Sequence, residues 1–382
     1  MTDSIRSDDS RWKVIDLFSG AGGMSYGFKA QPDFFEIVGA ADIEVAKPGR
    51  GKSPGTSTKC NATYEHNIGV RPENVDLALI PPAELRSRFG VERGELGVLI
   101  SCAPCTGFSQ KNANNLVNDD PRNHLVQRSG HFVEEFLPAF FVMENVKELL
   151  VGKHRHHFEE LREILVRLGY SFRADVLNFA DYGLPQKRIR SLIIARRDGG
   201  PIPPLPPASR KTTVRDAISH LPPIEQGQAH PEDPMHVCPR HTDEVTERMR
   251  AIPRDGGSWG DIVESHPHLL IPSMLNKRPG SFPDVYGRMW WDRPAPTITR
   301  ECASPGNGRY THPEQDRLLS VREMALLQGF PADYEFVGTL TQRYNQIGDA
   351  VPPLVSRQVA DHVRRMLLES WEDVPELQET LF

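Results

Sequence analysis

The segment SCAPCTGFSQ, residues 101–110, places Cys105 directly after a proline and shortly after the apolar stretch GVLI. A thiol on a loop behind a buried strand could act as a nucleophile, because the thiolate is the reactive form of cysteine. The spacing from Cys102 also suits a redox pair or half of a zinc site. Two buried structural cysteines are the plainest alternative, since free cysteine is among the most buried residue types. The rest of the chain has to decide among these interpretations.

The elements around Cys105 alternate between strands and helices. Helical patterns occupy HFVEEFLPAF and HFEELREILVRLG, on either side of the apolar run FFVME. Such alternation indicates an α/β fold with a parallel sheet and crossover helices. Residues 13–28 are expected to form a short strand, a glycine-rich turn and the start of a helix. The other expected strands are 36–42, 97–101, 140–144 and 190–197.

The alternation ends at GGPIPPLPPASR (199–210), whose proline and glycine content is typical of a semi-extended linker. Residues 211–293 have little periodicity and predict a small irregular domain. Helical patterns return at 320–330 and at 353–371, and the last is expected to pack back on the sheet. The predicted domains are therefore 1–198 with 345–382, and 199–344.

Charge and cysteine content restrict the class of protein. The 382 residues include 45 Lys and Arg against 51 Asp and Glu, a net charge of −6, so bulk electrostatics alone would not hold this chain on nucleic acid. Five scattered cysteines argue against a disulfide framework and for a reducing compartment. The polar N-terminus and the absence of a run of about 20 apolar residues predict a cytoplasmic globular protein.

The motif FSGAGG resembles a dinucleotide loop only in part, because the third glycine of the usual spacing is replaced by Ser25. The layout still predicts a ligand at the carboxyl ends of the strands, with close backbone approach at Gly20, Gly22 and Gly23. Asp42, about twenty residues further on, is placed to accept ribose hydroxyls. An ordinary strand-end turn is the alternative role for Asp42.

Six stretches taken together are more specific than any one of them. DLFSGAGG, APCTGFS, MENV, GLPQKRIR, REMALLQGFP and GDAVPP stand in this order along residues 13–363. In order and spacing the chain resembles the cytosine-C5 DNA methyltransferases of bacterial restriction-modification systems. The resemblance implies a Rossmann-like, mostly parallel sheet with helices on both faces. It also places a target-recognition region at 211–293.

The resemblance implies S-adenosyl-L-methionine as the methyl donor. Phe18 matches the residue against the adenine, Asp42 the ribose acid, and Asp76 the acid near the adenine amino group. The full set of matching cofactor positions is Asp16, Phe18, Ser19, Gly20, Gly22, Gly23, Asp42, Ile43, Asp76, Leu77 and Ala350.

The matching catalytic residues are Cys105, Glu144, Arg188 and Arg190. Carbon 5 of cytosine is a poor nucleophile, and addition of the Cys105 thiolate to carbon 6 makes it reactive. Glu144 should then be protonated to donate a hydrogen bond to ring nitrogen 3, and burial after the run FFVM favours that form. Arg190 would hold oxygen 2, with Arg188 in support. A flipped-out base is needed, because a stacked base cannot reach the thiol.

The implied partner is double-stranded DNA, bound by a monomer in the nucleoid, with a restriction endonuclease acting separately. Thr297 matches a residue near the target backbone. The remaining DNA-binding candidates are Gln186, Arg240, Lys277 and Arg278, with Arg248 and Arg250 as further possible base readers. The chain departs from the family at Thr106 (usually glutamine), at Asp349 (usually asparagine) and in a basic insertion at 47–59.

Other functions remain open on the sequence alone. A zinc site would need a second pair of ligands, and the HRHHF cluster beginning at His154 is the best candidate. A redox pair should open a helix, whereas GFSQKN after Cys105 suits a loop. An RNA methyltransferase shares these motifs, but a long irregular region favours DNA readout. A non-enzymatic DNA-binding relative would not need Cys105, Glu144 and Arg190, so their presence argues against it.

Overall fold

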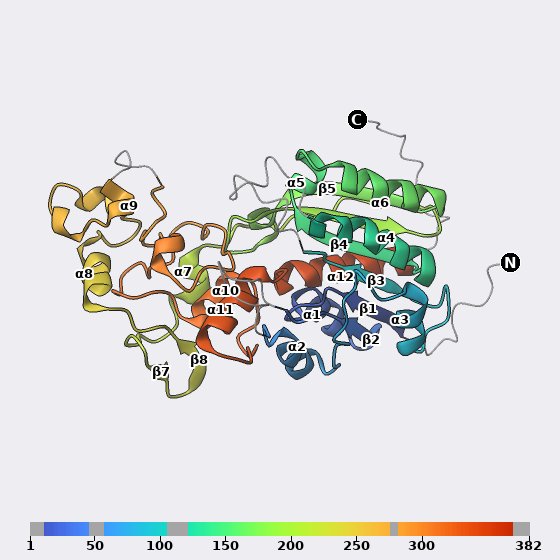
Figure 1. Cartoon of the computed structure of the whole chain (residues 1–382), viewed down its shortest axis with the longest axis horizontal. Coiled ribbons are helices and arrows are strands. Elements are labelled where there is room, and N and C mark those ends of the chain that lie inside the picture. Colours follow the sequence, from blue (N-terminus) through green and yellow to red (C-terminus); the bar gives the residue numbers. More distant parts are fainter. Residues whose placement is uncertain (1–10, 46–56, 105–120, 276–281, 370–382) are drawn as a thin grey trace.

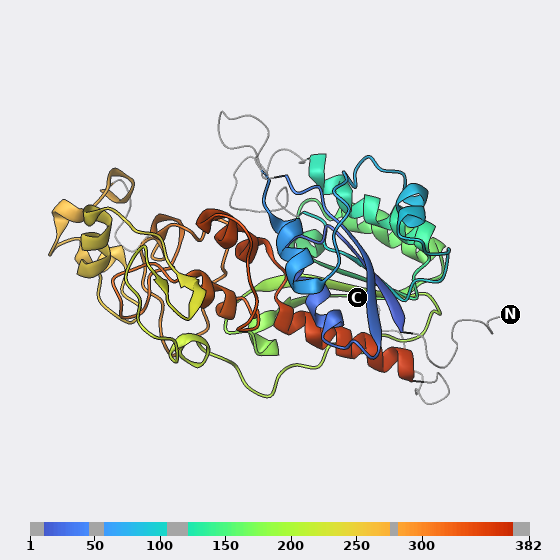
Figure 2. The same ribbon diagram turned by 90° about the horizontal axis from the view of Figure 1, so that it is seen from below.

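The computed structural model describes residues 11–45, 57–104, 121–275 and 282–369. A large lobe is built on a six-stranded sheet with the strand order β2-β1-β3-β4-β6-β5. A smaller lobe, with short elements and long connections, extends from one end of it (Figure 1). The N-terminal strand and the last helix lie in the large lobe, so the chain leaves this lobe and returns to it (Figure 2).

The sheet is mixed. β1, β2, β3 and β4 run parallel, and β6 is antiparallel to both of its neighbours. Five of the six strands confirm predicted strands; β5 was not predicted. The bounds are Trp12–Leu17 (β1), Phe35–Ala41 (β2), Val98–Ser101 (β3), Phe140–Val146 (β4), Ser171–Asn178 (β5) and Ile189–Arg196 (β6).

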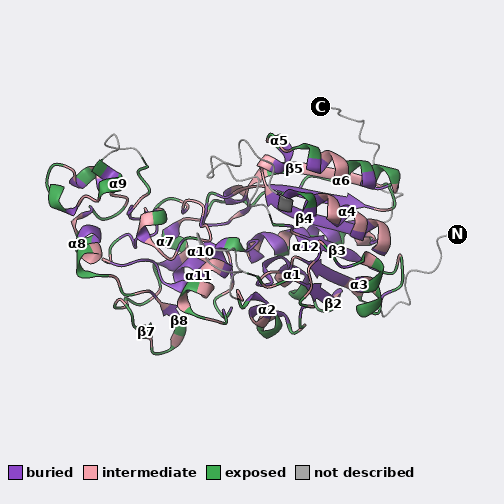
Figure 3. Cartoon of the chain, viewed as in Figure 1, coloured by how far each residue is buried: buried purple, intermediate pink, exposed green. Residues whose placement is uncertain are grey.

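The central strands are mostly apolar because helices cover both faces of the sheet. Leu17 and Leu99 belong to the core on the side of α3 (Pro82–Arg88), α4 (Leu125–Phe136) and α6 (His156–Arg167). Val14 and Val98 belong to the core on the side of α1 (Gly23–Lys29) and α12 (Pro353–Leu368). In Figure 3 these strands are buried along almost their whole length. The predicted fold class and the packing of the last helix are confirmed.

The small lobe has two apolar clusters. One gathers the elements next to the large lobe, including α7, α10 and α11, and the other lies around α8, η4, η5 and α9 at the far end (Figure 1). The bounds are Val214–Ile218 (α7), Ala229–His230 (β7), Asp233–Val237 (β8), Asp243–Ala251 (α8), Trp259–Ile262 (η4), Pro267–Leu269 (η5), Pro272–Leu275 (α9), Pro305–Asn307 (η6), Val321–Leu327 (α10) and Leu340–Asp349 (α11). The irregularity predicted for this region is thus a series of short elements. Four further short helices are Cys60–Ile68 (α2), Pro121–His124 (η2), Glu148–Val151 (α5) and Phe179–Tyr182 (η3).

A buried ion pair anchors α10. Ser320 and Glu323 form a capping box at its first turn, which satisfies backbone donors that a helix leaves unpaired. Both carboxylate oxygens of Glu323 also accept hydrogen bonds from Arg317, each at 2.8 Å. Burial raises the pKa of Glu323, but the Arg317 guanidinium outweighs it and holds the pKa at about 2. Glu323 is therefore ionised in the core of the small lobe.

The return of the chain to the large lobe differs slightly from the predicted domain boundary. A boundary between 344 and 345 would divide α11, whose Tyr344 and Ile347 both pack in the small-lobe core. Ala350 still belongs to that core, whereas Val351 belongs to the core around α12. The packing therefore changes from one core to the other between Ala350 and Val351, directly after the end of α11. The domain limits as a whole remain a prediction.

Candidate active site

A glycine-rich loop follows β1 at the carboxyl edge of the sheet. Phe18, Gly20 and Gly22 all have positive φ angles, of 57°, 50° and 88°, which fold the chain back on itself before α1 begins. Gly22 donates its backbone N–H to the carbonyl of Ser19 at 3.0 Å. A side chain at Gly23 could not fit, because its Cβ would lie 2.1 Å from the carbonyl oxygen of Val351. The loop is thus packed on one side by the start of α12.

The opposite side of the loop is open. A Cβ at Gly20 would meet no atom within 4 Å. The hydroxyl of Ser19 is buried and has no hydrogen-bond partner within the residues that the structure describes. The loop lies next to β1, between β2 and β3, where the strand order reverses and α/β sheets bind ligands. Backbone N–H groups and a spare hydroxyl at such a point can hold a small polar ligand.

Asp42 fixes the loop to the end of β2. Its carboxylate accepts the backbone N–H of Gly20 at 3.0 Å and that of Glu44 at 2.8 Å. Desolvation raises the pKa of Asp42, and these hydrogen bonds oppose the rise. The side chain is half-buried, so the carboxylate can still accept hydrogen bonds from a ligand.

Asp16 lies beneath the loop and is 1% exposed. Its carboxyl group accepts a hydrogen bond from the hydroxyl of Ser25 at 2.6 Å, and that hydroxyl lies 2.7 Å from the hydroxyl of Tyr64. Desolvation raises the pKa of Asp16 to about 7, against the Ser25 hydrogen bond, and the charge of Asp42 raises it further. Ser25 and Tyr64 were not predicted as site residues. Ser25 is the residue that breaks the dinucleotide pattern, and this was its only signal in the sequence.

Three other predicted cofactor positions border the same edge. Ile43, next to Asp42, is 42% exposed, which is unusual for a large apolar side chain. Asp76 accepts the backbone N–H of Ala78 at 2.9 Å and so shapes the turn that carries the buried Leu77. An exposed apolar side chain beside half-buried carboxylates suits a ligand with both a flat apolar and a hydroxylated part.

Glu144 and Arg190 meet across the sheet. Glu144 lies on β4 and Arg190 on the antiparallel neighbour β6, with 3.3 Å between Oε1 of Glu144 and Nε of Arg190. Both side chains are largely buried, and Oε1 receives no hydrogen bond of good geometry from the described residues. The next residue, Asn145, donates to the carbonyl of Ala103, just before the segment with Cys105. A carboxyl group and a guanidinium thus stand together at one end of the sheet.

Arg188 has a different position. It is 3% exposed and donates to the carbonyls of Ile298 and Ala350, each at 3.2 Å. Arg188 therefore links the segments that contain Ile298 and Ala350, and its catalytic role stays a prediction. Ala350 is itself 8% exposed, and its carbonyl also accepts from Gln328 at 2.7 Å.

Residues 185–188 and 295–298 run side by side and join the lobes. Gln186 bridges to Ala295 in parallel, and Thr297 donates its hydroxyl to the carbonyl of Lys187 at 2.7 Å. Gln186 is fully buried and hydrogen-bonded to Leu327, Gln328 and Ile298. In this structure the Gln186 side chain supports the segment that carries Thr297 and has no surface to offer DNA.

The other predicted DNA-binding residues are scattered. Arg240 is exposed on the small lobe. Arg248 is buried, donates to the carbonyl of Leu269 at 2.6 Å and stacks on Tyr286, so the structure contradicts a role for Arg248 in reading bases. The remaining predictions lie outside the described residues: Cys105, Thr106, Lys277, Arg278 and residues 47–56 of the insertion.

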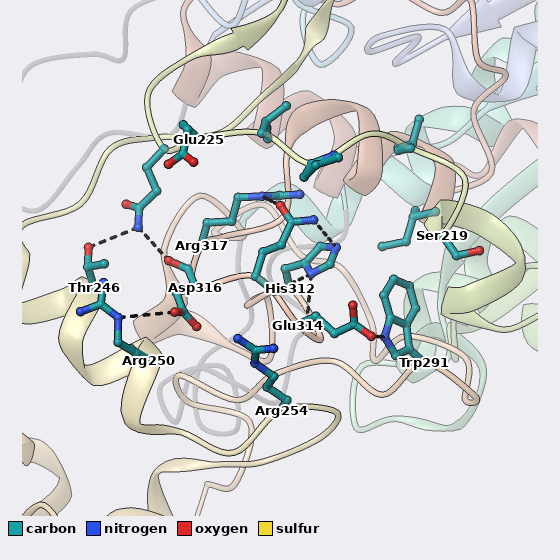
Figure 4. Close-up of a pocket in the computed structure, with 16 residues that line it drawn as sticks. Ser219, Glu225, Thr246, Arg250, Arg254, Trp291, His312, Glu314, Asp316 and Arg317 are labelled. Carbon is teal, nitrogen blue, oxygen red and sulfur yellow. Dashed lines mark hydrogen bonds and ion pairs between the residues drawn. The ribbon is translucent and has the colours of Figure 1, made fainter.

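A cavity of 680 Å³ lies in the small lobe, between the segment 218–226 and the loop 312–317 (Figure 4). Arg250 lies 3.5 Å from Asp316 there, and Trp291 donates its indole N–H to Glu314 at 2.8 Å. Arg250 is the one predicted DNA-reading residue among those that line this cavity. The cavity lacks the glycine-rich loop, Glu144 and Arg190, so it is separate from the candidate active site.

The family of the chain follows from comparison with known proteins. Residues 12–365 match the model of the C-5 cytosine-specific DNA methylases, and the chain belongs to this family of enzymes. It is 33% identical to the Type II methylase M.HgiDII of Herpetosiphon aurantiacus, over 93% of this chain and 95% of that one. It is 34% identical to the Type II methyltransferase M1.HphI of Haemophilus parahaemolyticus, over 92% of this chain and 86% of that one.

A solved structure agrees on the fold. The chain is similar to a prophage-encoded Escherichia coli protein described as a DNA modification methyltransferase, with a TM-score of 0.70 and 21% identity over 94% of this chain and 100% of that one. The family assignment and the fold predicted from the six stretches are therefore confirmed.

Three findings are limited to the described residues. No helix there is long and apolar enough to cross a membrane. No group of three or more His, Cys, Asp or Glu side chains there is arranged to hold a metal ion. None of the four cysteines in that part of the chain forms a disulfide.

Proposed function

We propose that this chain methylates carbon 5 of cytosine in double-stranded DNA and takes the methyl group from S-adenosyl-L-methionine. The observation that carries the proposal is the pairing of Glu144 with Arg190 at the same edge of the sheet as the glycine-rich loop. A donor of hydrogen bonds for nitrogen 3 and a cation for oxygen 2 are what a cytosine ring needs when a nucleophile adds to it.

The methyl donor fits the residues around the glycine-rich loop. The buried Ser19 hydroxyl and the open space at Gly20 can accommodate a polar ligand, and Asp42 can accept ribose hydroxyls. The exposed side chain of Ile43 can pack against a base. When bound, S-adenosyl-L-methionine supplies an electrophilic methyl group.

The residues of the chain make the cytosine able to accept that group. The Cys105 thiolate adds to carbon 6, which turns carbon 5 into an enamine carbon. Glu144 protonates or hydrogen-bonds nitrogen 3, while Arg190 holds oxygen 2. Arg188 keeps the segment 298–300 beside the site through its bond to Ile298. After methylation nitrogen 3 returns its proton to Glu144, a base removes the proton from carbon 5, and the Cys105 thiolate leaves as the 5,6 double bond re-forms.

The proposal extends to the setting of the reaction. The enzyme acts as a monomer on DNA in the bacterial cytoplasm, and it protects that DNA from a separately acting restriction endonuclease. The Type II names of its relatives support a restriction-modification role. Thr297 and Arg240 remain candidate DNA contacts, together with Lys277 and Arg278.

Bisulfite sequencing of a plasmid that expresses the protein tests the function. We expect protected cytosines at one recurring sequence, because a target-recognition lobe reads bases. Total tRNA from the same cells, treated in parallel, should show no new protected cytosine. Methylated tRNA with an unmethylated plasmid would move the chain to an RNA substrate, and no protected cytosine in either would contradict the proposal.

A further inference from the structure

Residues 348–351, here called the connector, touch both sides of the candidate active site. At one end a Cβ on Gly348 would lie 2.3 Å from the backbone of Thr299, so the two backbones pack directly together. At the other end the carbonyl oxygen of Val351 fills the space beside Gly23 in the glycine-rich loop. The connector therefore links the segment that carries Thr297 to the loop proposed to hold the methyl donor.

An ion pair fastens the connector to the segment 295–300. The guanidinium of Arg300 pairs with the carboxylate of Asp349, and the two side chains are 18% and 48% exposed. The backbone carbonyl of Arg300 also accepts a hydrogen bond. The donor is the side-chain amide nitrogen of Asn345, in the amide orientation that satisfies both of its polar atoms, at 2.9 Å. Arg300 is thus bound to α11 through both its backbone and its side chain.

A second guanidinium holds the same two segments from the large lobe. Arg188 donates from Nη1 to the carbonyl of Ile298 and from Nη2 to the carbonyl of Ala350. Two residues after Arg188, at the start of β6, Arg190 pairs with Glu144. A change in the distance between the segment 295–300 and the connector would therefore alter the hydrogen bonds of Arg188. Because Arg190 follows two residues later, such a change would also shift its contact with Glu144.

We propose that Arg300 and Asp349 are a positioning pair that keeps the DNA-facing segment and the methyl-donor loop in register. The inference rests on the proposed function. Asp349 stands where the family usually has asparagine, and a neutral amide needs no counter-ion. A carboxylate beside a DNA-binding segment repels phosphates unless a cation neutralises it, and Arg300 supplies that cation. The two residues act through the segments that they join and need not touch the substrate.

A double-mutant cycle tests the pair. The variants are Arg300→Gln, Asp349→Asn and the double variant, assayed on duplex DNA for kcat and KM, with DNA binding by fluorescence anisotropy and Tm measured alongside. We expect each single variant to lower kcat by about tenfold, a common size for coupled neighbours. The kcat of the double variant should be no lower than that of the less active single variant. Arg300→Gln should also weaken DNA binding, because it removes a positive charge from beside the Asp349 carboxylate, whereas Asp349→Asn should not.

The matched control is Arg155→Gln, which breaks an exposed ion pair with Glu159 on α6 and should leave kcat, DNA binding and Tm unchanged. If Arg300→Gln does not fold, Arg300→Lys keeps the charge but loses the planar fork, and it should show a smaller loss of kcat. Additive losses in the double variant, or losses of kcat that follow Tm, would overturn the inference. An inactive wild-type chain would instead contradict the proposed function.

Discussion

Replacement of Glu144 by glutamine separates catalysis from folding. Glutamine keeps the shape of the side chain and can still hydrogen-bond, but it cannot give up a proton to nitrogen 3 of the cytosine. The side chain of Glu144 is 9% exposed and lies 3.3 Å from Arg190, so the substitution changes a defined, largely buried contact. We therefore expect a large loss of turnover in a protein that still folds.

The expected loss of methylation rate is larger than the expected loss of folding stability. Loss of a general acid costs about 10²–10⁴ in rate, which corresponds to about 3–5 kcal/mol of activation free energy. Loss of the ion pair leaves the largely buried Arg190 without this partner, but glutamine can still hydrogen-bond to it, so we expect about 1–2 kcal/mol of lost stability. In a protein of this size each kcal/mol lowers Tm by about 2–4 °C.

Single-turnover methyl transfer to duplex DNA, with Tm measured on the same samples, tests this expectation. Glu134→Gln is the matched control, because the same change is made on α4 at a glutamate whose partner is the exposed Arg167. The reasoning is refuted if Glu144→Gln methylates within about threefold of the wild type, a change of well under 1 kcal/mol. It is equally refuted if the control loses as much activity.

Three further outcomes follow from buried groups. Glu323→Gln should lower the free energy of unfolding by about 3–5 kcal/mol in urea titrations, because it leaves Arg317 buried and unpaired. The pKa of Glu323 is held at about 2, so its contribution is present above pH 4–5 and is lost as the pH falls toward 2, whereas the variant should lack that acid-dependent loss. The pH dependence of stability should be opposite at Asp16, because its pKa is raised to about 7. Wild-type stability without added ligand should fall as the pH rises from about 4 to 7. Asp16→Asn should remove that fall in thermal scans. Gly23→Ala should cost about 1–3 kcal/mol in the same scans, because its Cβ would meet Val351, whereas Gly69→Ala, at a φ of 88° with open space, should show only backbone strain.

The apolar runs made most of the sheet predictable. Strands that are buried on both faces are rich in apolar residues, and β1, β3 and β4 each contain a continuous apolar run or pair in their buried part. β5 was missed because it lies at the edge of the sheet, where its residues are only partly buried and charged side chains such as Arg173 and Asp175 are tolerated. The short elements of the small lobe have too little periodicity to be placed from the sequence alone.

The site was predictable where a motif fixes the backbone and less so where contacts join distant residues. The glycine-rich loop follows the first strand as its motif predicts, and Glu144 and Arg190, which come from two separate motifs, meet in the structure. Burial of Gln186 depends on Gln328, 142 residues further on, and the partner of Asp349 is 49 residues away. Such pairs arise from tertiary packing, and no local sequence pattern predicts them.

Duplex DNA with 5-fluorocytosine at the target position tests the central claim most directly. Fluorine replaces the hydrogen at carbon 5 and cannot leave as a cation, so elimination stops after methyl transfer and the sulfur of Cys105 should stay bonded to carbon 6. We expect a denaturant-stable protein–DNA adduct that forms with S-adenosyl-L-methionine, with the modified peptide mapped by mass spectrometry to Cys105. An enzyme that methylates ordinary DNA but forms no adduct, or one whose adduct maps to another residue, would contradict the account.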